Sequence, residues 1–292
     1  PLHEVETNRA LARWLAQILG LDYGGSYSVD LHAQADLYLL PTQTLVGPAQ
    51  ALSLGVKGPE DLWGGYVDHD FICTKAITHG LHGPDAVAPE GWSPLFAERV
   101  RAVVLGGLSV FAEQDARAAA MQLLELGPIR LKPVHACAGR GQEVVESLKQ
   151  FDAILARADV SDLFAKGVVL EQDLQDVVTH SVGQSFIGGH VFSYCGEQYL
   201  TQDGQGEAVY GGSELLVVPG YYEDLLTLSL DEDVRLAIEQ AQVFDNAADE
   251  AYPGFYASRR NYDIAQGLDS QGAQRSGVLE QSWRMGGASS AE

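Results

Sequence analysis

The sequence predicts a mixed α+β protein built from at least two lobes. At 292 residues the chain exceeds the usual size of a single domain. Amphipathic helical segments alternate with short buried strands in its middle part, and antiparallel strands joined by glycine turns follow. A long helix and a final pair of apolar strands close the chain. This succession favours separate lobes over one continuous sheet.

Residues 1–105 are expected to form a small α/β lobe. Thr7 can cap a helix whose apolar stripe runs to Leu19. Residues 37–40 are apolar and precede a proline, which predicts a short buried strand. Helical spacing returns over 96–105, after a long region rich in Gly, Pro and His.

Residues 106–292 are expected to form a second unit, with a lid lobe over about 106–166 and a core lobe over about 167–292. The ending at Glu292, where a helix should begin, predicts a trimmed C-terminus. The expected elements are a helix over 113–126, a strand over 128–133, a helix over 144–158, strands over 167–170, 181–187, 190–194 and 198–201, a helix over 231–251, and a strand pair carrying Asp263 and Glu280. The segment 210–213 is read as a turn.

Composition limits the classes of partner. Forty acidic against eighteen basic residues give a net charge of −22, which argues against nucleic acid or an anionic membrane. No apolar run approaches the length of a membrane span. The first residues show no basic region followed by an apolar block, so the sequence predicts no signal peptide. The three cysteines are widely spaced and odd in number, which fits reduced thiols in a cytoplasmic protein.

The C-terminal strand pair carries the strongest chemical signal. Glu280, Ser282 and Arg284 alternate, so a single strand would present all three on one face. Asp263 lies on the preceding apolar strand and could supply a second carboxylate. Two carboxylates and a guanidinium suit a metal-bound phosphate group. The competing interpretation is a buried ion pair at a strand end.

Two further segments suggest nucleotide contacts. Lys132 lies in an apolar strand, and residues 138–142 follow as a glycine-rich loop whose backbone N–H groups could turn toward phosphate. Most such loops are only hairpin turns. Glu171 ends a later apolar strand and could accept a hydrogen bond from an adenine amino group, although a strand-end acid is the simpler reading.

In this order the parts resemble the ATP-grasp superfamily, in particular its biotin-carboxylase and carboxylate–amine ligase branches. The similarity covers roughly residues 106–292. More narrowly, the chain resembles an uncharacterised bacterial family described as biotin carboxylase-like, DUF3182. The resemblance implies an ATP-grasp fold, in which two α/β lobes clamp the nucleotide, preceded by a small α/β domain.

The resemblance also implies roles for individual residues. The matches to ATP-contacting positions are Lys132, Gly139, Arg140, Gly141, Gln142, Glu171, Gln172, Leu174 and His180. The matches to metal ligands are Asp263, Glu280 and Ser282, and Arg284 matches the arginine that faces the transferred group. Two departures stand out. Ser282 replaces the usual Asn, and an earlier phosphate lysine has no clear match. Lys75, Arg99 and Arg101 are the candidates for it, although an ordinary surface cation is the simpler reading of each.

The implied activity is an ATP- and Mg²⁺-dependent ligase, with Mn²⁺ as an alternative metal, acting on a small-molecule carboxylate. The carboxylate would be activated as an acyl phosphate and then attacked by an amine or another nucleophile. Lys132 and Arg284 would act as the catalytic cations. The alternatives are a biotin carboxylase-type enzyme and a non-catalytic ATP-binding regulatory protein. A homodimer is also expected from the resemblance.

A rival metal site lies in the first lobe. The densest cluster of potential ligands is His69, Asp70, Cys73, His79 and His82. Its spacing matches no closed zinc module, so contact with the substrate is the favoured role for this loop.

Overall fold

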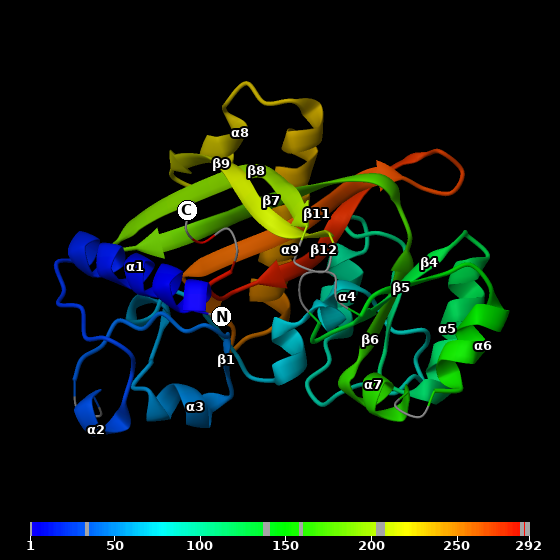
Figure 1. Ribbon diagram of the computed structural model, residues 1–292, viewed down its shortest axis with the longest axis horizontal. Helices are drawn as coiled ribbons and strands as arrows, with labels where there is room; N and C mark the ends of the chain where they lie inside the picture. Colours follow the sequence, from blue (N-terminus) through cyan, green and yellow to red (C-terminus); the bar gives the residue numbers. More distant parts are fainter. Residues whose placement is uncertain are drawn as a thin grey trace.

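Figure 1 shows the computed structural model, in which long strands cross the centre, a smaller sheet with helices lies to the right, and the N-terminal segments lie at the lower left. Residues 2–32, 35–136, 141–157, 160–202, 208–286 and 289 are described. The chain has the mixed α+β architecture that the sequence predicts.

The central sheet is antiparallel, with strand order β12-β11-β7-β8-β9. Its strands are β7 (Gln175–Ile187), β8 (His190–Gln202), β9 (Ala208–Pro219), β11 (Arg259–Leu268) and β12 (Gln274–Ser282). One face is covered by α9 (Glu232–Ala251), with α8 (Tyr222–Leu226) beside β8 and β9. The other face is therefore free to carry polar side chains.

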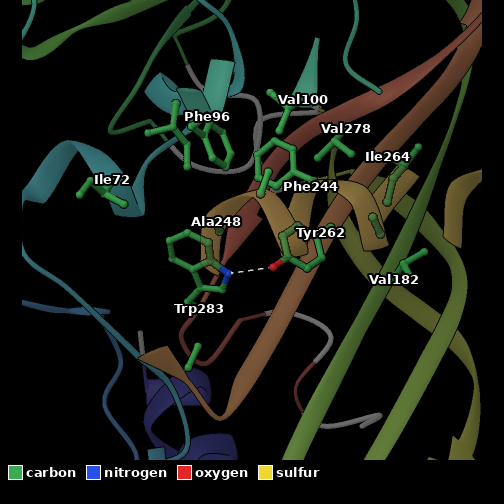
Figure 2. Close-up of a cluster of buried hydrophobic side chains, with 14 of the residues drawn as sticks. Ile72, Phe96, Val100, Val182, Phe244, Ala248, Tyr262, Ile264, Val278 and Trp283 are labelled. Carbon is green, nitrogen blue, oxygen red and sulfur yellow. Dashed lines mark hydrogen bonds between the residues drawn. The ribbon is translucent and has the colours of Figure 1, made fainter. Parts of the chain in front are cut away.

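The main core lies between this sheet and α9. Phe244 of α9 packs edge-on against Tyr262 of β11, and against Phe96 of α4 (Pro94–Val100). Figure 2 shows this cluster together with the hydrogen bond from Trp283 Nε1 to the Tyr262 hydroxyl, 3.3 Å long. Alanine and phenylalanine at helical spacing on α9 let the helix approach the sheet closely.

The second sheet has four antiparallel strands in the order β3-β6-β4-β5. The strands are β3 (Gly107–Val110), β4 (Ile129–Pro133), β5 (Glu143–Val145) and β6 (Val168–Gln172); the helices beside them are α5 (Glu113–Leu124), α6 (Leu148–Leu155) and α7 (Val160–Lys166). These elements bury a separate apolar cluster. The sequence predicts β6 in the core lobe, whereas in the structure it is an inner strand of this second sheet, so the lid lobe ends after Gln172.

The N-terminal segments do not form a separate lobe with its own sheet. They comprise α1 (Leu2–Leu19), α2 (Val29–His32), β1 (Leu45–Val46), α3 (Pro48–Ser53), β2 (Gly65–Val67), three 3-10 turns (Pro59–Asp61, Asp70–Cys73 and Lys75–Thr78) and α4. β2 pairs with β1 and with β10 (Tyr256–Ala257), a strand from the C-terminal part. Val104 also bridges Val278 of β12. The expected boundary at residue 105 therefore does not separate two independent units.

Several local expectations are corrected. The helix over 144–158 begins as strand β5, and only α6 is helical, because Ser147 caps it and the residues before the cap pair with β4. The two strands expected over 190–201 are one strand, β8. The segment 210–213 lies within β9, and in place of a strand over 37–40 only Leu39 forms a single bridge.

Candidate functional site

The two predicted acidic ligands lie side by side. Asp263 on β11 and Glu280 on β12 are direct cross-strand partners, while the next pair is Ile264 with Val278. Leu279 is thus an extra residue, and it forms a β-bulge. Because Val278 and Ile264 belong to the core under α9, simple alternation would turn Leu279 toward Asp263. The bulge places Glu280 there instead.

Neutral amides hold the Asp263 carboxylate. Oδ1 accepts hydrogen bonds from Gln198 Nε2 at 2.8 Å and from Asn261 Nδ2 at 2.9 Å. The Tyr194 hydroxyl donates in turn to Asn261 Oδ1 at 3.1 Å. Burial raises the pKa of Asp263 to about 7, and the negative charge of Glu280 adds to the rise, although the two amide hydrogen bonds oppose it. A positive charge placed between Asp263 and Glu280 would relieve the repulsion between the two carboxylates.

Lys75 joins this acidic pair. It lies in a 3-10 turn, its side chain is only 7% exposed, and Nζ is 2.9 Å from Glu280 Oε2. Nζ also donates to the backbone oxygen of Ala136 at 2.7 Å, two residues before the glycine-rich segment 138–142 in the sequence. The expectation of a surface cation is therefore wrong for Lys75. It holds for Arg99, which is exposed and pairs with Glu250.

The turn that carries Lys75 is fastened to β12 by side chains. Thr78 donates to the oxygen of the bulge residue Leu279 at 3.1 Å. Gln281 Nε2 donates to the backbone oxygens of Ile72 at 2.7 Å and Thr74 at 2.8 Å. No periodicity in the sequence marks these contacts, because they join segments about 200 positions apart.

A second buried ionic group lies in the lid sheet. Glu171 of β6 is 2% exposed, contacts Lys132 of β4 through Oε1, and lies 2.9 Å from His79 Nε2 through Oε2. Burial acts to raise the pKa of Glu171, but the charges and hydrogen bonds of Lys132 and His79 outweigh it and lower the pKa to about 2. The carboxylate expected to accept from adenine is thus already held by two protein side chains.

The glycine-rich loop is described only in part. Gly139 and Arg140 lie outside the described residues. Gly141 has φ +67°, a conformation that favours glycine, and Gln142 leads into β5. The link from Lys75 to the oxygen of Ala136 places Ala136, two residues before this segment in the sequence, near Glu280.

His180 is not directed toward the acidic pair. It is two positions from Val182 on β7, which packs in the core under α9. His180 Nε2 lies 3.2 Å from Gln266 Oε1, and Gln266 in turn donates to the backbone oxygen of Asp233 at the start of α9. Asp263 is on the opposite face, so the structure does not bring His180 to the acidic pair. Strand alternation is the reason.

The remaining predicted residues are placed as follows. Ser282 is the cross-strand partner of Asn261, on the face that carries the acidic pair. Arg284 follows the end of β12, and its Nη1 donates to the backbone oxygen of Met285 at 2.8 Å. At the hinge Gln172 N donates to the oxygen of Gly106, and Leu174 is buried.

The histidine-rich loop does not assemble a zinc site. Within the described ranges, no group of three or more His, Cys, Asp or Glu side chains could hold a metal. His79 is bonded to Glu171, and His69 stacks on Phe71. Asp263 and Glu280 are two carboxylates without a third such ligand beside them among the described residues. Such a pair suits a metal ion that takes its remaining ligands from water and a bound molecule.

Neither Asp263 nor Glu280 lines either of two cavities in the described part of the chain. One, of about 500 Å³, is lined by hinge residues Gly106 and Gln172 and by the β11–β12 turn. The other, of about 600 Å³, lies between α1 and the segment that follows it, with Met285 on its wall. No helix in the described part of the chain is long and apolar enough to cross a membrane.

Solved structures similar to this chain include three ligase-type enzymes. D-alanyl-alanine synthetase A from Vibrio cholerae O1 biovar eltor has 14% identity and a TM-score of 0.41, over 65% of this chain and 53% of that one. D-alanine–D-alanine ligase from Coxiella burnetii has 12% identity and a TM-score of 0.43, over 80% and 53%. Biotin carboxylase from Campylobacter jejuni, solved with β,γ-ATP, has 17% identity and a TM-score of 0.35, over 66% and 39%.

The chain matches about half the length of these proteins or less. No curated protein sequence matches it significantly. The model of one family, described as a protein of unknown function, matches residues 1–292 in full. The chain therefore belongs to that family, DUF3182.

Proposed function

We propose that the protein is an ATP- and Mg²⁺-dependent ligase of ATP-grasp type that activates a substrate carboxylate. One observation carries the proposal. Asp263 and Glu280 are cross-strand partners on the sheet face away from α9, and the buried Lys75 bridges Glu280 to Ala136, which precedes the glycine-rich segment in the sequence. Carboxylates, a lysine and a glycine-rich loop are the groups that a metal–triphosphate complex requires.

The acidic pair fits Mg²⁺ by its donor chemistry. Mg²⁺ usually takes one or two carboxylates and completes its shell with water and substrate phosphates. Asp263 and Glu280 would supply these carboxylates, and the Ser282 hydroxyl would be a weaker third donor. When bound, Mg²⁺ would neutralise charge on the phosphate oxygens. Mn²⁺ has similar ligand preferences and would serve as a replacement.

The chain's own residues would act mainly by position and charge. Gln198 and Asn261 fix one oxygen of Asp263 and thus orient the carboxylate. Lys75, and Lys132 from the lid, would balance charge on the phosphates. In the reaction, a substrate carboxylate oxygen attacks the γ-phosphorus and ADP leaves. An amine then attacks the acyl carbon and phosphate leaves, with Arg284 facing the anionic intermediate.

Ligand-dependent stability tests the proposal. Thermal unfolding of the whole chain is measured with ATP, with Mg²⁺ and with both. A ligand at ~100 times its dissociation constant adds roughly 2.7 kcal/mol to the free energy of unfolding, or a few degrees for a chain of this size. We expect this shift to require both components and to disappear in Glu280→Ala. Glu250→Ala is the matched control, since it removes a glutamate paired with an exposed arginine elsewhere.

Each outcome points to one conclusion. If the wild type responds to no nucleotide, or if Glu280→Ala keeps the full shift, the proposed site is wrong. Binding followed by phosphate release with a pool of carboxylates and amines supports the ligase. Phosphate release that needs biotin and bicarbonate favours a biotin carboxylase. Binding with no release from any pool favours a non-catalytic ATP-binding role.

A further inference from the structure

Strand β9 is an open edge of the central sheet. It has twelve residues, and β8 is its single partner among the described strands. The opposite edge is covered, because Val278 N of β12 donates to the oxygen of Val103 at 2.9 Å and Val104 bridges Val278. A long edge strand exposes a row of backbone donors and acceptors that another strand can pair with.

The exposed side chains of β9 lie on both faces of the sheet. Leu216 is 45% exposed and lies opposite Cys195, which packs in the core on the α9 side. Val217 is 37% exposed and lies opposite Tyr194, whose hydroxyl reaches Asn261 on the other face. A molecule bound on one face of the sheet would cover only one of these two side chains. A strand added at the edge would cover both, through cross-strand pairs.

The charge pattern of β9 favours a second copy of this chain as the partner. Glu214 is the single residue between Ala208 and Pro219 that is charged at neutral pH, whereas the whole chain has forty acidic residues and a net charge of −22. Two copies would repel through most of their surface, but little at this strand. Natural edge strands are commonly protected by lysine or other charges, and apart from Glu214 this one has none.

Symmetry makes self-pairing geometrically simple. A two-fold axis that crosses an edge strand brings the same strand of a second copy alongside it in antiparallel orientation. With the axis near Leu216, each Glu214 would face an uncharged residue of the other copy. We propose that β9 pairs with β9 of a second copy of this chain and joins the two five-stranded sheets into one continuous sheet. Contact along one edge is small, so the dimer would be reversible.

Sedimentation equilibrium of the whole chain over roughly a hundredfold range of concentration tests this interface. We expect a twofold rise in mass from the dilute to the concentrated end. The dimer fraction should increase when salt is raised from about 0.05 M to about 0.5 M, because salt screens the repulsion between the two acidic copies. Leu216→Lys and Val217→Lys should each keep the protein monomeric. Val243→Lys, at a comparably exposed site on α9, should dimerise as the wild type does.

Amide hydrogen exchange identifies the interface without any substitution. On the wild type, amides of β9 should gain protection as concentration rises, while those of α9 should not. A wild type that stays monomeric at every concentration and salt level overturns the proposal. A dimer that survives both substitutions, or that leaves β9 amides unchanged, also overturns it. These results do not depend on nucleotide binding.

Discussion

At the scale of the residue, Glu171 illustrates burial and charge acting in opposite directions. Its carboxylate is almost fully buried, which costs free energy when it is ionised, yet contacts to Lys132 and His79 keep it ionised. Asp263 represents the opposite case. Burial and the charge of Glu280 raise its pKa to about 7, and the hydrogen bonds from its two neutral amide neighbours do not offset them. The pKa values of the two buried acids are therefore shifted in opposite directions.

Replacing Glu171 by Gln should destabilise the protein in a pH-dependent way. The folded-state pKa of about 2 lies below the ordinary value of 4.5, so the ionised group stabilises the fold above about pH 4.5. That stability is lost as the pH falls toward 2. We expect a loss on the order of 3 kcal/mol at pH 7, shrinking by about 2 kcal/mol at pH 3. Urea unfolding of both proteins at the two pH values measures it, and a difference independent of pH would contradict the assignment.

At the scale of the element, the bulge in β12 decides which side chain meets Asp263. Alternation along the strand correctly predicts that Glu280 and Ser282 share a face, and the sequence therefore identifies both. It does not reveal that Leu279 is an extra residue, nor that Thr78 from a distant turn satisfies the Leu279 carbonyl. The same alternation places His180 on the core side of β7, away from Asp263 and Glu280.

Thr78→Val should therefore weaken the site as well as the fold. The change keeps the shape but leaves a buried carbonyl without its donor, at a cost of about 1–3 kcal/mol. Since the bulge positions Glu280, Mg²⁺-nucleotide affinity measured by calorimetry should fall too. Thr44→Val removes a similar hydrogen bond, to the Trp283 oxygen, and should cost stability alone. Equal affinities for the two variants would mean that the bulge does not position the metal ligand.

At the scale of the whole molecule, the lobes differ in how much of their sheets and apolar cores they share with the rest of the chain. The lid buries its own apolar cluster and the chain enters and leaves it at one place, where Gln172 N donates to the oxygen of Gly106. The N-terminal segments instead share strands and core with the C-terminal part, through Tyr66 with Tyr256 and through Trp283. The length of the chain indicates several lobes. It does not show which distant segments join in one sheet or one apolar core.

A fragment of residues 1–105 should consequently remain unfolded. It lacks β10, β12 and α9, against which its apolar side chains pack. Far-ultraviolet circular dichroism and the dispersion of proton NMR signals would show this. The lid, residues 106–173, should retain its strands and helices as a fragment, although a unit of this size is only marginally stable. If the 1–105 fragment folded cooperatively, residues 1–105 would be an independent domain, as the sequence predicts.

The sequence by itself determined the α+β class, the long helix α9, the last strand pair and the shared face of Glu280 and Ser282. These depend on local periodicity and on the chemistry of each side chain, which are visible in one dimension. The tertiary structure alone decided that Lys75 and His79 join the two acidic groups, that His180 faces away, and that β6 belongs to the lid. Such pairings join positions far apart in the chain, and they depend on register, on a one-residue bulge and on packing.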